Sequence, residues 1–128
     1  TATTEIYTLS LHDALRSNGP KAMEDLASYD PENLIVGILG GSKGTTRDCF
    51  ELIHKANKYG AKVALFGRKI NLSEDPIGLV KLMRKVVEGD ATSEEAVKIY
   101  HDQLNKKKLT PDRNLKNDLQ ITDSILKL

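Results

Sequence analysis

Two apolar runs decide the fold of this 128-residue chain: LIVGIL at residues 34–39 and KVALF at residues 62–66. Neither run alternates between apolar and polar residues, which is typical of strands that are buried on both faces of a parallel sheet. A helix is predicted between them, over residues 46–59, and Gly60 ends it. A strand–helix–strand unit of this kind has parallel strands and a right-handed crossover. The sequence therefore predicts an α/β fold.

Further helices are predicted on both sides of this unit. Prolines that suit a first helical turn begin helices over residues 21–28 and 76–87. A capping box, in which a threonine and a glutamate three residues later satisfy each other's backbone N–H groups, begins a helix over residues 93–106. The tail, residues 109–128, is polar with scattered leucines, and we expect it to wrap around the domain or to fray.

Two parallel strands cannot cover both of their faces without further chain. A protein built from these elements alone would expose much of LIVGIL or of KVALF. We therefore expect the chain to be part of a larger parallel sheet.

The composition is that of one globular domain, with 39% hydrophobic and 29% charged residues and a net charge of +1. This balance gives no electrostatic reason to expect a nucleic-acid partner, and residues 106–108, three lysines, are typical of a solvated helix end. The single cysteine, Cys49, excludes an internal disulfide and a cysteine-based zinc site. No apolar run is long enough for a membrane span, and no secretory signal is present. We expect a cytoplasmic protein without a membrane partner.

The first seventeen residues resemble a translated laboratory sequence. TATTEIYTLSLHDALRS can be written in codons that reproduce a widely used short-read sequencing adapter, with one base dropped before the last two residues. We therefore interpret residues 1–17 as a non-native segment fused to a truncated gene that begins at Asn18, so that Tyr7, His12 and Asp13 carry no function. The alternative is a natural strand and helix start, because EIYTLSL alternates acceptably. We expect the segment to pack poorly; a well-ordered strand there would show only that a β-prone string filled a vacant edge.

Glycine-rich segments follow both apolar runs, where the carboxyl ends of adjacent parallel strands would meet. Ligands bind at that edge in barrels and in doubly wound sheets. Glycines let backbone N–H groups approach an anion, an arginine can add a bidentate contact, and a lysine can add a point charge. Each loop alone could be a tight turn, but the pair favours a phosphate site. The candidate phosphate-binding residues are Gly40, Gly41, Ser42, Lys43, Gly67 and Arg68.

With these loops, the segment from Asn18 to about Leu104 resembles the class I, Schiff-base aldolases of the DeoC/LacD group. That group includes archaeal-type fructose-bisphosphate aldolases and their thiolase-like and transaldolase-like relatives. Its last two strands carry a Gly-Gly phosphate loop and then a Gly-Arg-Asn loop; here Lys69 stands where the asparagine is usual. Asp75-Pro76 matches the segment after the last strand. The resemblance implies that residues 18–108 are the last two βα units of a truncated (β/α)8 TIM barrel.

The resemblance also implies that the Schiff-base lysine belongs to the strand just before Asn18, where the adapter-like string stands. Neither Lys21 nor Lys43 matches its position, and Lys62 lies at the far end of its strand. We therefore expect a C-terminal fragment of a lyase that acts on a phosphorylated sugar or keto substrate. It would be inactive alone and need no cofactor or metal, and its parent would form a homo-oligomer. The alternatives are a non-catalytic phosphate-binding half-barrel, or another phosphate-using barrel enzyme such as an isomerase or synthase.

Other chemically capable residues are predicted to have structural roles. His54 and His101 fall within helices without a metal-ligand partner at helical spacing, and they are interpreted as surface or packing residues. Cys49 is expected in the core. The acids Glu74 and Asp75 are expected to cap the following helix. Ser42 has no nearby base and is not expected to act as a nucleophile.

Overall fold

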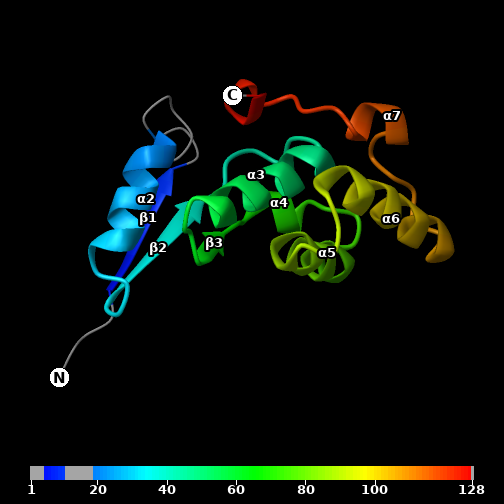
Figure 1. The fold of residues 1–128 in the computed structure, drawn as a ribbon. Coiled ribbons are helices and arrows are strands. Elements are labelled where there is room, and N and C mark those ends of the chain that lie inside the picture. Colours follow the sequence, from blue (N-terminus) through cyan, green and yellow to red (C-terminus); the bar gives the residue numbers. More distant parts are fainter. Residues whose placement is uncertain (1–4, 11–18, 128) are drawn as a thin grey trace.

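The computed structural model describes residues 5–10 and 19–127, and its side chains from residue 21 onward. Three parallel strands form one sheet in the order β1-β2-β3 (Figure 1): β1 (Glu5–Ser10), β2 (Leu34–Leu39) and β3 (Val63–Leu65). Gly37 lies opposite Val63, and Leu39 lies opposite Leu65. The predicted parallel pairing of the two apolar runs is confirmed, although β3 is shorter than the expected residues 62–66.

Helices surround and extend this sheet. Figure 1 shows α2 beside β1 and β2, α3 next to β3, and α5 and α6 at the other end of the molecule. The helices are α2 (Gly19–Tyr29), α3 (Thr46–Lys58), α4 (Arg68–Asn71), α5 (Pro76–Glu88), α6 (Ser93–Lys106), α7 (Leu115–Asp118) and the 3-10 helix η1 (Ser124–Lys127). The four long helices agree with the sequence-based ranges to within two residues at each end.

The ends of the long helices follow from local chemistry. Thr45 and Thr92 each form a capping box at the start of α3 and α6, and the side chain of Asp75 accepts a hydrogen bond from Gly78 at the start of α5. Gly89, with φ of 82°, ends α5 in the left-handed conformation that glycine adopts most readily. The short helix α4 was not expected from the sequence. It is a single turn in which the carbonyl of Gly67 accepts hydrogen bonds from the N–H groups of Ile70 and Asn71.

Two hydrophobic clusters form the core. The first lies between α2, β2, α3 and the C-terminal tail, and the second between α3, α5 and α6; Phe66 packs against both. Met23, Val36, Ile38, Leu52 and Leu126 are central in the first cluster, and Phe50, Leu82, Val97, Tyr100 and Leu104 in the second. The tail therefore wraps around the domain, as one of the two predicted possibilities had it.

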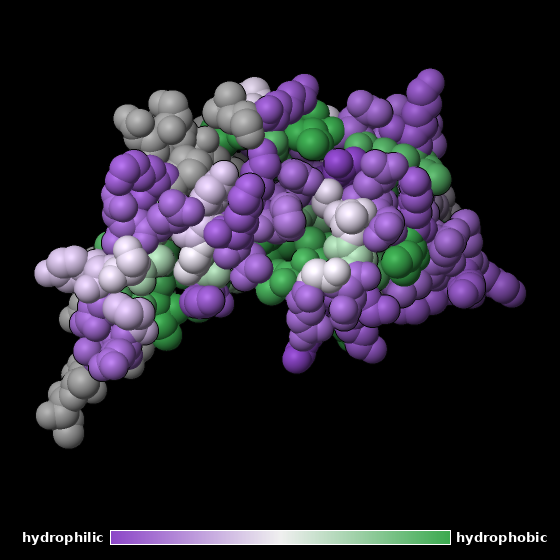
Figure 2. All heavy atoms as spheres, viewed as in Figure 1, coloured by the Kyte–Doolittle hydropathy of each residue, from purple (hydrophilic) through white to green (hydrophobic). Residues whose placement is uncertain are grey.

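One face of the sheet is less covered than the other. Val36 and Ile38 are almost completely buried, whereas Leu39 and Leu65, on the opposite face of neighbouring strands, are 39% and 52% exposed. Figure 2 shows a mostly polar surface with apolar patches between its polar side chains. Among the residues that the structure describes, no helix has the length and apolar character that a membrane span requires.

The structure describes part of the adapter-like segment. Residues 5–10 form β1, which pairs with β2 from Glu5 opposite Leu34 to Ser10 opposite Leu39. Such pairing is expected of a β-prone string beside a free strand edge, and it does not bear on the origin of the segment. The predicted junction at Asn18 is therefore not tested, because the positions around it lie outside the described residues. Those positions include His12, Asp13 and Asn18 itself.

Candidate functional site

The loops after β2 and β3 leave the same edge of the sheet. The backbone N–H of Gly40 donates to the carbonyl of Leu65 at 3.0 Å, which extends the parallel ladder by one residue. Gly40 also lies against the ring of Phe66: a methyl group added at Gly40 would be only 2.5 Å from Phe66 Cδ1. The structure thus brings together the two segments that the sequence predicted to form one site.

The loop after β2 presents a run of unused backbone donors. The N–H groups of Gly41, Ser42, Lys43 and Gly44 make no hydrogen bond with any residue that the structure describes. Gly44 has φ of 61°, so the loop turns through the left-handed region. Consecutive N–H groups in such a loop form a concave, anion-binding surface. The loop therefore presents main-chain donors that no described residue uses.

The two predicted cations differ in their surroundings. The side chain of Arg68 is exposed and makes no hydrogen bond or ion pair with any residue that the structure describes. Lys43, in contrast, forms an ion pair with Asp112 from the C-terminal tail. Arg68 is thus free to contact an anion, whereas Lys43 would first have to leave a carboxylate.

Lys69 is the residue that sequence reasoning missed. It is only 5% exposed, and its Nζ donates to the carbonyl of Ser42 at 2.9 Å and to that of Lys43 at 3.4 Å. It therefore ties the β3 loop to the β2 loop. The sequence signal was its place directly after Gly67-Arg68, where the aldolases that the sequence resembles usually have a shorter, neutral asparagine.

The sequence resemblance places the Schiff-base lysine on the strand before Asn18. Residues 1–17 contain no lysine, and Asn18 lies outside the described residues, so the structure does not test where that lysine would stand. Lys21, the first lysine of the chain, is exposed on α2 and pairs with Asp25 at 2.8 Å.

The C-terminal tail holds the start of α3, directly after the β2 loop. Both carboxylate oxygens of Asp48 accept hydrogen bonds from the tail: Oδ1 from the N–H of Thr122 at 2.8 Å and Oδ2 from its hydroxyl. The hydroxyl of Thr45 donates to the carbonyl of Gln120 at 2.7 Å. Arg113 donates to the carbonyl of Gly44 at 2.8 Å. The tail therefore supports the loop from behind.

Asp48 makes several of the contacts with the tail, and these contacts shift the pKa of its carboxyl group. The residue is 1% exposed. Burial by itself would raise the pKa of the Asp48 carboxyl, but hydrogen bonds from Thr122, Thr45 and Asp123 outweigh burial, and its pKa lies below the ordinary value. The charged form of Asp48 is thus the one that the tail stabilises.

The predicted roles of the neighbouring acids are half correct. Asp75 caps α5 as expected, and the hydrogen bond from Lys107 at 2.6 Å lowers its pKa. Glu74 is not a cap, so that prediction was wrong. Its carboxylate accepts from the hydroxyl of Tyr100 at 3.0 Å and from the backbone N–H of Asp112 at 2.8 Å. The carboxylate of Glu74 therefore contacts α6 and the tail instead of the start of α5.

The histidines and the cysteine have the structural roles predicted for them. His54 is exposed on α3, and His101 is buried in α6, where its Nε2 lies 2.8 Å from Oδ2 of Asp118 in the tail. Burial raises the pKa of the Cys49 thiol to about 12, so the thiolate is disfavoured. Among the described residues, no group of three or more His, Cys, Asp or Glu side chains could hold a metal ion.

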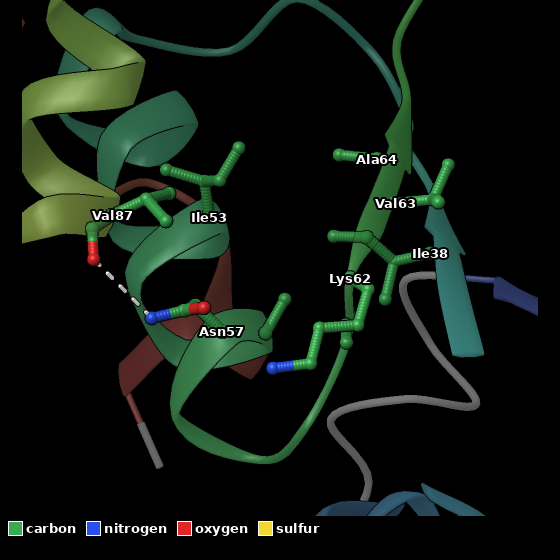
Figure 3. Close-up of a pocket in the computed structure, with 9 residues that line it drawn as sticks. Ile38, Ile53, Asn57, Lys62, Val63, Ala64 and Val87 are labelled. Carbon is green, nitrogen blue, oxygen red and sulfur yellow. Dashed lines mark hydrogen bonds between the residues drawn. The ribbon is translucent and has the colours of Figure 1, made fainter. Parts of the chain in front are cut away.

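The cavities of the structure lie elsewhere or are small. A cavity of about 190 Å³ lies between β2, β3 and α3 (Figure 3), where Ile53 and Val87 face Ile38 and Ala64. The predicted site residues do not line it, and its walls are mainly apolar. Between Lys43, Lys69 and Glu74 lies a cavity of only about 10 Å³, which is too small for a phosphate. An anion would therefore bind on the open side of the loops.

A matched pair of glycine substitutions tests the packing of the two loops. We expect Gly40→Ala to lower the free energy of unfolding by about 1–3 kcal/mol, because its methyl group would overlap the ring of Phe66. Gly67 has nothing within 4 Å of an added methyl group and an ordinary φ of −102°, so Gly67→Ala should change stability by less than about 0.5 kcal/mol. Urea unfolding measures both, and equal losses for the two variants would contradict the described loop geometry.

Comparison with known proteins finds relatives that match part of this chain. No protein-family model matches the chain. It is 34% identical over 83 residues to a protein named an uncharacterized aldolase from Pasteurella multocida, which covers 65% of this chain and 28% of that protein. It is 32% identical over 80 residues to the 3-hydroxy-5-phosphonooxypentane-2,4-dione thiolase of Salmonella typhimurium, covering 62% and 27% of the two. The same enzyme of Yersinia enterocolitica is 36% identical over 63 residues, covering 49% and 22%. The chain thus spans about a quarter of the length of these curated relatives, which are named as an aldolase and as thiolases.

Proposed function

We propose that this chain binds the phosphate group of a sugar or keto substrate at the sheet edge formed by residues 40–44 and 67–68. The observation that carries the proposal is the run of four consecutive backbone N–H groups, from Gly41 to Gly44, without an acceptor among the described residues. The side chain of Arg68, exposed and without a described partner, supplies a cation beside them. The name of the thiolase relatives includes a phosphonooxy group, a phosphate ester, which fits such a site.

The site is proposed as the phosphate-binding part of an aldolase-like lyase with a (β/α)8 barrel. The parallel strand order, the helix between β2 and β3, and the names of the relatives support this proposal. In such a barrel, residues 18–108 would be the last two βα units, and the phosphate loops would lie at the carboxyl ends of the strands. The cytoplasmic location and the homo-oligomeric parent stay predictions.

Binding and carbon–carbon chemistry are separable in this chain. A Schiff-base enzyme needs a nucleophilic lysine in a low-dielectric pocket next to the substrate carbonyl. None of the strands β1, β2 and β3 contains a lysine, and the whole stretch before Asn18 lacks one. Lys21 is exposed and paired with a carboxylate. We therefore propose that the chain binds the phosphate but does not form an imine.

The test is a titration of the 15N-labelled chain with dihydroxyacetone phosphate, followed by two-dimensional NMR. The amide signals of Gly41, Gly44 and Arg68 should shift and saturate, whereas unphosphorylated dihydroxyacetone should leave them unchanged. Borohydride is then added to the same sample, and the intact mass of the chain should not change. Equal shifts with both ketones would refute the phosphate site, and a reduced adduct on any lysine would refute the absence of imine chemistry.

A further inference from the structure

Lys69 places a buried positive charge directly behind the candidate phosphate loop. Its Nζ contacts two neutral carbonyl oxygens, those of Ser42 and Lys43. No carboxylate of the described residues lies within 4.0 Å of this nitrogen. A buried ammonium without a counter-ion is costly, so this arrangement favours an anion nearby. The acids near the loop have other partners: Asp112 pairs with Lys43, Glu74 accepts from the hydroxyl of Tyr100 and the backbone N–H of Asp112, and Asp48 accepts from Thr45 and the tail.

The contacts of Lys69 also determine which way the loop donors point. In a trans peptide unit, the C=O and the following N–H point in opposite directions, and the described residues contain no cis peptide bond. Because the carbonyls of Ser42 and Lys43 point toward Lys69, the N–H groups of Lys43 and Gly44 point away from it, both to the other side of the loop. These are two of the donors without a described acceptor.

We infer that Lys69 is a positioning residue of the phosphate site and makes it selective for dianionic phosphate monoesters. The inference rests on the proposed function. Lys69 fixes the donors of Lys43 and Gly44 on the ligand side, and its charge acts through the loop without touching the ligand. The charge of Lys69 would lie about one peptide unit from the ligand in a partly buried site. There, one positive charge strengthens binding by roughly tenfold to a hundredfold for each negative charge on the ligand. A dianion therefore gains more from Lys69 than a monoanion.

The experiment measures the affinity of the 128-residue chain for glycerol 3-phosphate at pH 5 and at pH 7.5. A phosphate monoester changes from monoanion to dianion with a pKa of about 6. The wild-type chain should bind the dianion at least about tenfold more tightly than the monoanion. Lys69→Met should remove most of this gain while changing the affinity at pH 5 much less, and Lys69→Arg should keep it. Lys62→Met, which removes an exposed lysine at the opposite end of β3, is the matched control and should behave as wild type.

A second measurement on the wild-type chain does not depend on how the variants fold. The methyl diester of glycerol 3-phosphate remains a monoanion at pH 7.5, and we expect it to bind at least about tenfold more weakly than the monoester. Equal affinity for monoester and diester, or a folded Lys69→Met chain with the full wild-type gain, would overturn the role of Lys69 and leave the phosphate site standing. Absence of any shift at Gly41 and Gly44 with glycerol 3-phosphate would overturn both.

Discussion

Replacement of Asp48 by alanine is expected to lower the free energy of unfolding by roughly 3 kcal/mol, because several donors around this buried carboxylate lose their shared acceptor. Those donors are the N–H of Thr45, the N–H and hydroxyl of Thr122, and the N–H of Asp123. Urea unfolding gives the value. Asp102→Ala, which removes an exposed acid from α6, is the matched control and should change stability by less than about 0.5 kcal/mol. A loss below about 1 kcal/mol for Asp48→Ala would mean that the tail is not held through this carboxylate.

The same variant should change the acid limb of the stability curve. The pKa of Asp48 is lower in the folded chain than its unfolded value of about 3.9. Its contribution is therefore complete above that unfolded value, and it is lost as the pH falls through the lower, folded pKa. Between pH 5 and pH 2, the wild-type chain should lose more stability than Asp48→Ala does.

Replacement of Arg68 by alanine is expected to weaken binding of a phosphate monoester by about 1.5–3 kcal/mol, the usual worth of a charge-assisted hydrogen bond. This corresponds to roughly a tenfold to hundredfold increase in Kd. Stability should stay within about 0.5 kcal/mol, since the exposed side chain has no partner among the described residues. Isothermal titration with glycerol 3-phosphate measures the affinity.

Arg84→Ala is the matched control for this prediction. Arg84 is an exposed arginine on α5 whose guanidinium pairs with Glu88 at 2.8 Å, away from the loops. Its removal changes the net charge of the chain by the same amount as Arg68→Ala. Comparable losses of affinity for the two variants would indicate a general charge effect instead of a contact at Arg68.

The parts of the fold that could be predicted are those with a local cause. Unalternating apolar runs identified β2 and β3 as parallel neighbours, and the capping box before Ser93 gave the bounds of α6. The short helix α4 has no such local signal. It forms where Lys69 can reach back to the carbonyls of the β2 loop, so it depends on a contact between two loops.

The sequence could predict the candidate site only where its residues follow the strands directly, and not where the tail contacts them. The glycines and Arg68 could be named as candidates because they follow the strands directly, and they stay predictions. The attachment of Asp48 and the ion pair of Lys43 were not, because their partners Thr122 and Asp112 lie about seventy residues further along a polar tail without periodicity. Glu74 was misassigned for the same reason, since its carboxylate contacts Asp112 in place of the nearby helix end.

The attachment of the tail has a consequence for the order in which this protein folds. During synthesis, Thr122 follows Asp48 by 74 residues, and Gln120 follows Thr45 by 75. A nascent chain that has completed β2, α3 and β3 has the local capping box of α3 but still lacks the hydrogen bonds by which the tail holds the start of α3 and the β2 loop. Closing such a long loop costs entropy before any contact repays it, and contacts distant in sequence slow folding. The loop proposed to hold phosphate therefore acquires its final shape late, after the strands that carry it.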